Sequence, residues 1–493
     1  MRRSGVLLPI TSIPSKYGIG CMSQEAYDFI DQLKMAGQHY WQILPIGPTG
    51  AGDSPYQSFS TFAGNPYFID LEALVKQELL TVEECENTAY GDNEQYIDYD
   101  KIFLARKKLL HLAYSRVVLE ELEGFSEFCG GEHEWLEDYA LYMATKDYFE
   151  GQCFIEWDED IRLRTQEAII SYREKLQMEM GFYRYIQYEF FKQWKKLKAY
   201  ANEQGIQIVG DIPIYVAFDS ADTWSHPALF QFDEDGLPTG VAGCPPDGFS
   251  ATGQLWGNPL YNWEYHKKTG YDWWVRRIAH CYRLYDMLRV DHFRGFDEYY
   301  AIPYGDETAE FGAWEKGPGY DIFRVLKERL GEQAVIAEDL GFLTQSVLDL
   351  VEETGYPGMK VLHFAFDEQG DSSYLPHNYT QNCVVYTGTH DNTTTVGWFR
   401  AMSEKEREIV YKYLGVKKIS EEEISWTINR MALSSVADVC IIPIQDYLGL
   451  GEEARINEPS TVGQNWKWRL LPGQIEEELL AKMKDMSVLY GRR

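Results

Sequence analysis

Short apolar runs that end in charged residues recur along this chain of 493 residues. The clearest is the stretch 287–295, which begins apolar and then places Arg289, Asp291, His292 and Arg294 within six positions. Because unpaired charges are costly to bury, such a run predicts a strand whose carboxyl end opens into a polar pocket. Taken alone, the stretch fits an ordinary ion-pair network equally well.

Three further apolar runs end in the same way, each followed by a carboxylate: 206–210 before Asp211, 335–337 before Glu338, and 383–387 a few residues before Asp391. Four separate strands that lead to acids are difficult to explain as four independent solubility devices. In α/β proteins the carboxyl ends of the strands carry the chemistry. We therefore predict that these acids belong to one site.

The apolar runs alternate with amphipathic helical segments, such as the one predicted between an N-cap at Ser23 and a stop at Gly37. This alternation predicts an α/β fold, a closed (β/α)8 TIM barrel, over an open doubly wound sheet. Nucleotide enzymes are disfavoured because no glycine-rich phosphate loop opens a helix. The eight predicted strands are 5–8, 41–46, 206–212, 287–290, 334–338, 359–364, 383–387 and 436–442.

We expect one catalytic barrel over residues 1–493, with mainly helical inserted subdomains. Residues 65–181 are predicted to form a mainly helical insertion between strands 2 and 3, because a simple crossover needs far fewer residues. Residues 213–272 are predicted to form an insertion with a lid loop between strands 3 and 4. Its large aromatics, Phe249 and Trp256, could anchor the loop to the barrel rim or stack on a substrate.

Charge and composition restrict the classes of molecule that this protein is expected to bind. Forty-six basic and 77 acidic residues give a net charge of −31, which disfavours nucleic acid and anionic membranes and suits a neutral substrate. The 15% of aromatic residues, including 14 Trp and 35 Tyr, fit either a large core or stacking on sugar faces. No apolar run approaches the roughly twenty residues of a membrane span.

The eight cysteines are scattered and form no Cys/His cluster. They are typical of reduced thiols in a cytoplasmic protein. The apolar run near the start of the sequence is too short, and too rich in proline, for a signal peptide. We therefore expect a cytoplasmic protein that needs no metal ion and no cofactor.

Two carboxylates on either side of a bond, one ionised and one protonated, are what retaining glycosidic cleavage requires. Arg289 lies two residues before Asp291, on the same face of the strand, and can keep this aspartate ionised. This favours Asp291 as the nucleophile. Glu338 follows an apolar run, so burial and nearby acids can raise its pKa toward that of a general acid. Asp391 would hold sugar hydroxyls, and His390 is either a hydrogen-bond donor to one of them or a polar core residue.

Several motifs together resemble the 4-α-glucanotransferase family (amylomaltase, or disproportionating enzyme), which is allied to the α-amylases. They are Ser-Pro-Tyr-Gln-Ser at 54–58, Asp211, Arg-Val-Asp-His-Phe-Arg-Gly at 289–295, Ala-Glu-Asp-Leu-Gly at 337–341 and Gly-Thr-His-Asp-Asn at 388–392. The resemblance covers nearly the whole chain. It implies a (β/α)8 barrel with helical insertions and without an appended carboxyl-terminal β-domain.

The resemblance also implies Asp291 as nucleophile, Glu338 as acid/base and Asp391 as transition-state stabiliser. The residues expected to bind substrate are Tyr56, Asp211, Phe249, Trp256, Arg289 and His390. Some relatives carry an aromatic residue at the positions of Ala51 and Gly248, where this chain has small residues. This difference leaves open whether a secondary glucan contact exists there.

The implied reaction cleaves an α-1,4-glucan, forms a glycosyl-Asp291 intermediate and passes the glycosyl segment to the 4-hydroxyl of an acceptor glucan or glucose. The expected partners are α-1,4-glucans and maltooligosaccharides; the oligomeric state is left open. Two alternatives remain: an α-amylase-type hydrolase with the same three acids, and a non-catalytic glucan-binding protein. Turnover of maltotriose and its products would separate all three.

Overall fold

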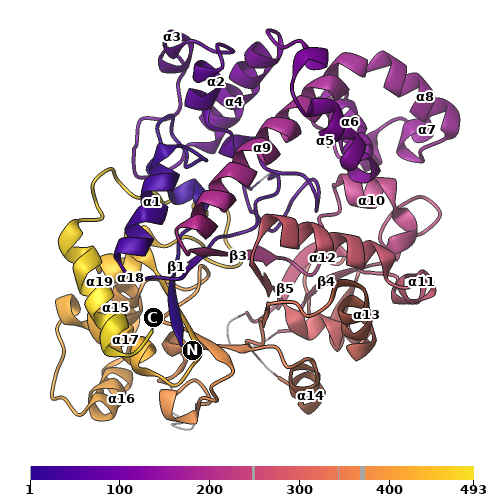
Figure 1. Ribbon diagram of the computed structural model, residues 1–493. Helices are drawn as coiled ribbons and strands as arrows, with labels where there is room; N and C mark the ends of the chain where they lie inside the picture. The colour runs from indigo at the N-terminus through magenta and orange to yellow at the C-terminus, as the bar shows by residue number, and fades with distance from the viewer. Residues whose placement is uncertain (1, 51, 247–249, 342, 367–371, 493) are drawn as a thin grey trace.

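Eight parallel strands close into a barrel at the centre of the protein (Figure 1). The structure is a computed structural model that describes residues 2–50, 52–246, 250–341, 343–366 and 372–492. The prediction of a (β/α)8 barrel is confirmed. In order around the barrel the strands are β1 (Arg3–Leu7), β12 (Val439–Pro443), β11 (Cys383–Tyr386), β10 (Gly358–Val361), β9 (Val335–Ala337), β6 (Met287–Val290), β3 (Gln207–Ile212) and β2 (Tyr40–Gln42).

All eight predicted runs overlap a barrel strand, but the boundaries differ and several strands are shorter than predicted. β2 ends at Gln42 rather than near residue 46, since Pro45 has no N–H to donate to a ladder. β10 ends at Val361, after which Leu362–Phe364 form a 3-10 turn at the barrel rim. β12 begins at Val439, because the preceding Val436 is exposed rather than buried.

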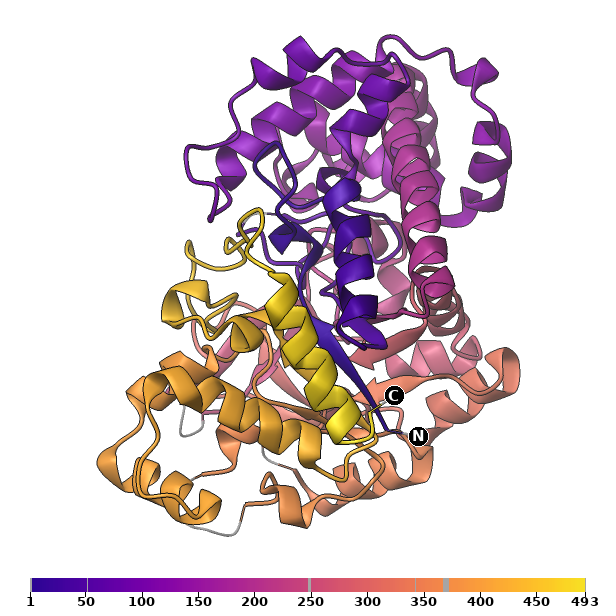
Figure 2. The ribbon, with the colours of Figure 1, turned by 60° about the vertical axis from the view of Figure 1, so that its left-hand side comes forward.

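Helices form an outer layer around the barrel. The first, α1 (Gln24–Met35), follows an extended Ser23 and buries one apolar stripe, and Gly37 then takes the left-handed φ of +66° that ends it. At the other end of the chain, α19 packs beside α1, so the two termini lie close together (Figure 2). The remaining helices of this layer are α12 (Asp272–Leu284), α13 (Tyr320–Leu330), α14 (Gln345–Thr354), α15 (Thr395–Ala401), α16 (Glu404–Leu414), α17 (Glu421–Ser434), α18 (Ile444–Leu448) and α19 (Glu477–Leu489).

The connection between β2 and β3 is helical and stands to one side of the barrel, at the top of Figure 1. Its last and longest helix, α9, returns the chain to the barrel, where the indole of Trp194 donates to the carbonyl of Leu284 at 3.1 Å. The boundaries 65–181 for a separate subdomain stay a prediction. The helices are α2 (Leu71–Lys76), α3 (Val82–Glu86), α4 (Tyr99–Tyr114), α5 (Phe125–Gly131), α6 (His133–Tyr148), α7 (Glu159–Arg162), α8 (Gln166–Lys175) and α9 (Gln177–Glu203).

A second, antiparallel sheet lies beyond the carboxyl ends of β3 and β6, in the order β5-β4-β7-β8. Part of the segment 213–272, in which a lid loop was predicted, thus forms the strand β5. The pairing was missed because half of the sheet comes from residues after β6, far away in the sequence. Its strands are β4 (Gly240–Cys244), β5 (Gln254–Pro259), β7 (Glu298–Pro303) and β8 (Ala313–Lys316), and the short helices α10 (Ala221–Ser225) and α11 (Trp263–Lys268) flank β4 and β5 in the sequence.

The close contact between β3 and the residue that follows α12 generates a stability prediction. A Cβ on Gly210 would lie 2.2 Å from ring atoms of Tyr285, a side chain that is only 3% exposed. Because the ring has little room to move, Gly210→Ala should lower the free energy of unfolding by about 1–3 kcal/mol. The measurement is the shift in the urea midpoint at unchanged slope.

Gly130→Ala is the matched control. A Cβ at Gly130, in α5, would meet no atom within 4 Å, and this glycine is not among those with positive φ. The same glycine-to-alanine change should therefore leave stability unchanged or raise it slightly. Equal midpoints for the two variants would contradict the tight packing of β3 against Tyr285.

Candidate active site

A buried ion-pair cluster lies at the carboxyl ends of β3 and β6. Asp211 and Arg289 are register partners on these neighbouring parallel strands, so their side chains point to the same side of the sheet. Arg289 donates to both carboxylate oxygens of Asp211, at 2.8 and 2.7 Å. Its other terminal nitrogen lies 2.9 Å from Oδ1 of Asp291. One guanidinium, 2% exposed, thus binds two carboxylates.

The cluster is an ion-pair network, which was one of the two interpretations of the sequence. It has an excess of negative charge, because two carboxylates pair with one guanidinium. Asp211 is wholly buried, and burial together with the charge of Asp291 raises its pKa while Arg289 opposes the rise. Asp291 is only partly buried, with 29% of its side chain exposed. Asp291 is therefore the carboxylate of this pair that a substrate can reach.

Glu338 follows β9 and faces Asp291. Its two carboxylate oxygens accept backbone N–H groups of His292 and Leu340, each at 2.8 Å. Burial and the negative charge of Asp291 raise the pKa of Glu338 to about 7, against the lowering effect of Arg289 and the two N–H groups. A carboxyl group with this pKa can both give and take a proton near neutral pH.

His292 contributes to the site in a way that the sequence analysis did not foresee. Its backbone has a left-handed φ of +50°, which is unusual for a residue with a side chain and directs its N–H to Glu338. Its ring lies edge-on to Trp256, with centroids 4.8 Å apart. Among the described residues, the Nε2 atom of His292 is buried without a hydrogen-bond partner.

Asp391 and His390 follow β11 and form a second pair, in which His390 is buried and 40% of the Asp391 side chain is exposed. Nε2 of His390 lies 3.2 Å from Oδ2 of Asp391, and the side-chain amide of Asn457 donates to Oδ1 at 2.6 Å. Burial alone would raise the pKa of Asp391, but His390 and Asn457 lower it well below its usual value. Burial alone would lower the pKa of His390, but the charge of Asp391 raises it. Asp391 therefore stays ionised.

Tyr56 connects the two pairs. Its hydroxyl donates to Oδ2 of Asp211 at 2.8 Å and lies 2.9 Å from Nε2 of His390, while its ring stacks on the imidazole. Eight of the nine predicted site residues thus belong to one cluster or to its edge. They are Tyr56, Asp211, Trp256, Arg289, Asp291, Glu338, His390 and Asp391. Phe249 falls outside the described residues, as do Gly248 and Ala51.

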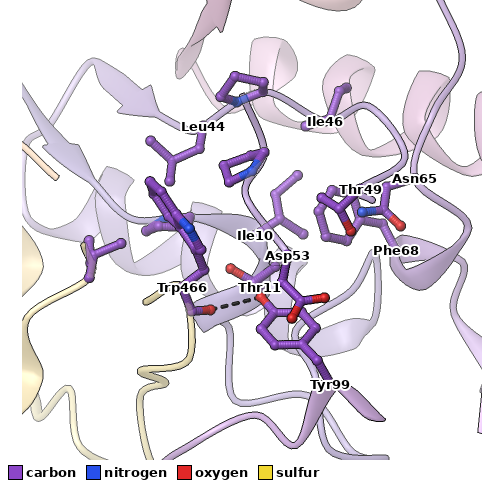
Figure 3. A pocket seen from close by; sticks show the side chains of 14 residues that line it. Ile10, Thr11, Leu44, Ile46, Thr49, Asp53, Asn65, Phe68, Tyr99 and Trp466 are labelled. Carbon is purple, nitrogen blue, oxygen red and sulfur yellow. Dashed lines mark hydrogen bonds between the residues drawn. The ribbon is translucent and has the colours of Figure 1, made fainter. Parts of the chain in front are cut away.

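Two residues from the segment after β12 were missed. Asn457 holds Asp391, and Trp466, with a φ of +65°, brings its ring within 5.9 Å of that of Tyr56. Figure 3 shows Trp466 among the side chains that line a pocket beside the site, where the hydroxyl of Tyr99 donates to the Trp466 carbonyl at 2.8 Å. A Trp in a glycine-like conformation leaves no sequence signal, because φ is not visible in residue types.

Within the described parts of the chain, His, Cys, Asp and Glu side chains form no group of three or more that could hold a metal ion. Across the same residues, no helix combines the length and apolar character needed to cross a membrane. All eight cysteines are free thiols.

Comparison with known proteins agrees with the geometry. The family model described as 4-alpha-glucanotransferase matches residues 8–474. The 4-alpha-glucanotransferase of Clostridium butyricum is 49% identical over 98% of this chain and 99% of its own length, and that of Thermus thermophilus is 45% identical over 99% and 98%.

Among solved structures, the amylomaltase from Streptococcus agalactiae in complex with acarbose superposes with a TM-score of 0.96 at 41% identity and full coverage of both chains. The amylomaltase from Corynebacterium glutamicum, at 18% identity and a TM-score of 0.79, shares the fold over 75% of its length. This chain belongs to the 4-alpha-glucanotransferase family and is a retaining transferase that acts on α-1,4-glucans.

Proposed function

We propose that Asp291 is the nucleophile, Glu338 the acid/base and Asp391 the transition-state stabiliser of glucan transfer. The observation that carries this assignment is the contrast between neighbouring carboxyl groups. Arg289 is bonded to Asp291, whereas the pKa of the buried Glu338 is raised to about 7. Two carboxyl groups that differ in this way fit the two roles that retaining cleavage needs.

In the first half of the reaction, Asp291 attacks the anomeric carbon of the donor glucan while Glu338 gives its proton to the glycosidic oxygen. The bond from the anomeric carbon to that oxygen breaks, and an ester bond to Asp291 forms. The leaving segment departs with a free 4-hydroxyl. The ionised Asp391, held by His390 and Asn457, lies where it can stabilise positive charge on the sugar ring.

In the second half, the ionised Glu338 takes the proton from the 4-hydroxyl of an acceptor glucan or glucose. The acceptor oxygen attacks the anomeric carbon, the ester to Asp291 breaks, and Glu338 is protonated again. Retention follows from two displacements at the same carbon. The backbone N–H groups of His292 and Leu340 stabilise the ionised form that this step requires.

The surrounding residues are proposed to bind α-1,4-glucans and maltooligosaccharides. Tyr56 and His390 present a stacked pair beside the acids, and Asp211 and Arg289 orient the nucleophile. Trp256, half-buried against His292, is placed to exclude water from Glu338 and to contact the acceptor. From the sequence alone, Phe249 is also proposed to exclude water and contact the acceptor. The protein is further proposed to be cytoplasmic.

The nucleophile is tested by Asp291→Asn. The change keeps the hydrogen bond to Arg289 possible but removes the oxygen that forms the glycosyl ester, so transfer from maltotriose should fall by about 10⁴-fold or more. The products are measured by chromatography. Asp272→Asn, at an exposed carboxylate of α12, is the control and should keep full activity. Near-normal transfer by folded Asp291→Asn protein would remove Asp291 from this role.

The raised pKa of Glu338 predicts how the rate depends on pH. Cleavage needs protonated Glu338, so kcat/KM for maltotriose should fall as the pH rises through about 7, by up to tenfold per pH unit above it. The measurement is a pH profile of initial rates.

Glu338→Gln supplies the control for this assignment. With a glycosyl fluoride donor, whose leaving group needs no proton, the variant should retain cleavage and lose the fall above pH 7. If the fall persists in the variant on this donor, another group is responsible for it.

Trp256 is expected to favour transfer over hydrolysis. Trp256→Ala should weaken acceptor binding by about 1 kcal/mol and admit water, so the ratio of new reducing ends to transfer products from maltotriose should rise several-fold. Trp256→Phe, which keeps an aromatic face, should give a smaller change. A uniform loss of rate at an unchanged ratio would instead assign Trp256 to anchoring β5.

A further inference from the structure

Trp314 is a large aromatic side chain that remains partly exposed to solvent. It lies on β8, the edge strand of the small antiparallel sheet, and 40% of its surface is open to solvent. Its register partner on β7 is Tyr300, which is buried. An exposed indole offers a flat apolar face on which a ligand can stack.

The two neighbours of Trp314 fix its orientation. The guanidinium of Arg294 lies over one face of the indole, with its central carbon 3.7 Å from the ring centroid. The ring of Tyr300 lies edge-on at 5.2 Å. Since Arg294 covers one face and is itself only 7% exposed, the open part of Trp314 is its opposite face. The stack with Arg294 makes this a rigid flat surface.

Arg294 also ties this surface to the catalytic centre. It lies three residues after Asp291, within the 3-10 turn Phe293–Phe296 that leads from the carboxyl end of β6. The same sheet carries Trp256 on β5, whose ring contacts His292 next to the nucleophile. Trp314 and Trp256 thus lie on the two opposite edge strands of one sheet, which stands beyond the carboxyl end of β6.

Polar groups flank the ring on the same face of the sheet. Glu298 and Lys316 are register partners two residues from Tyr300 and Trp314, so all four side chains lie on one face, and Nζ of Lys316 is 2.6 Å from Glu298. The Lys316 side chain is 72% exposed. An aromatic face beside an exposed ion pair matches a sugar, which has one apolar C–H face and a rim of hydroxyl groups.

We propose that Trp314 is a binding platform for an α-1,4-glucan chain, on which a sugar residue remote from the cleaved bond stacks while Glu298 and Lys316 bind its hydroxyls. The proposal rests on the glucan transfer activity of the family and extends it to the recognition of chain length. Only chains long enough to reach from the catalytic acids to β8 use the platform.

Binding is tested directly by calorimetry in the Asp291→Asn protein, with maltoheptaose and maltotriose as ligands. Adding Trp314→Ala should raise the Kd for maltoheptaose about fivefold and leave that for maltotriose unchanged. Trp314→Phe should restore most of the affinity. Phe103→Ala is the matched control, because Phe103 is 52% exposed on α4 with a cation, Lys107, over its ring.

In the active enzyme, Trp314→Ala should raise KM for long maltooligosaccharides severalfold, with kcat and the kcat/KM for maltotriose unchanged. Equal effects on short and long chains, or none, would overturn the platform. Loss of an oligomer in Trp314→Ala, seen by sedimentation, would assign the face to a contact between copies and would also overturn it. A wrong nucleophile assignment would be recognised separately, as turnover of maltoheptaose by Asp291→Asn.

Discussion

The site depends on one buried cation. Arg289 is almost inaccessible to water, and its charge is compatible with the barrel interior only because Asp211 and Asp291 both bind it. The pairing fixes Asp291, the proposed nucleophile, relative to β3 and β6. From Asp211 the connection continues through the hydroxyl of Tyr56 to His390 and from there to Asp391. Four barrel loops are thus held in one arrangement by a chain of polar contacts.

This arrangement separates the properties of the three acids. Burial and the negative charge of Asp291 raise the pKa of the Glu338 carboxyl to about 7, although two backbone N–H groups oppose the rise. A histidine and an amide bind the carboxylate of Asp391, and its pKa falls instead. Burial alone would raise both values. The difference in partners therefore sets which group exchanges a proton and which stays charged.

The barrel and most of its acids were predictable from sequence because both depend on local patterns. An apolar run followed by an acid shows where a parallel strand ends, and the barrel then brings the strand ends together. Contacts between distant segments leave no such pattern. β4 pairs with β5, which precedes β6 in the sequence, and with β7, which follows it. Asn457 reaches Asp391 from beyond β12, and His292 acts through its backbone rather than its side chain.

The helical connection between β2 and β3 supports the same network of contacts. From α6, the buried Lys146 binds Asp219 at 2.5 Å and lies 5.1 Å from the ring of Phe59, three residues after Tyr56. From α4, Tyr99 binds the carbonyl of Trp466, whose ring lies beside Tyr56 and His390. The helices therefore brace both loops that position the stacked Tyr56–His390 pair. Because that pair joins Asp211 to Asp391, a loosening of the helical connection would reach these two acids through Tyr56 rather than through the barrel strands.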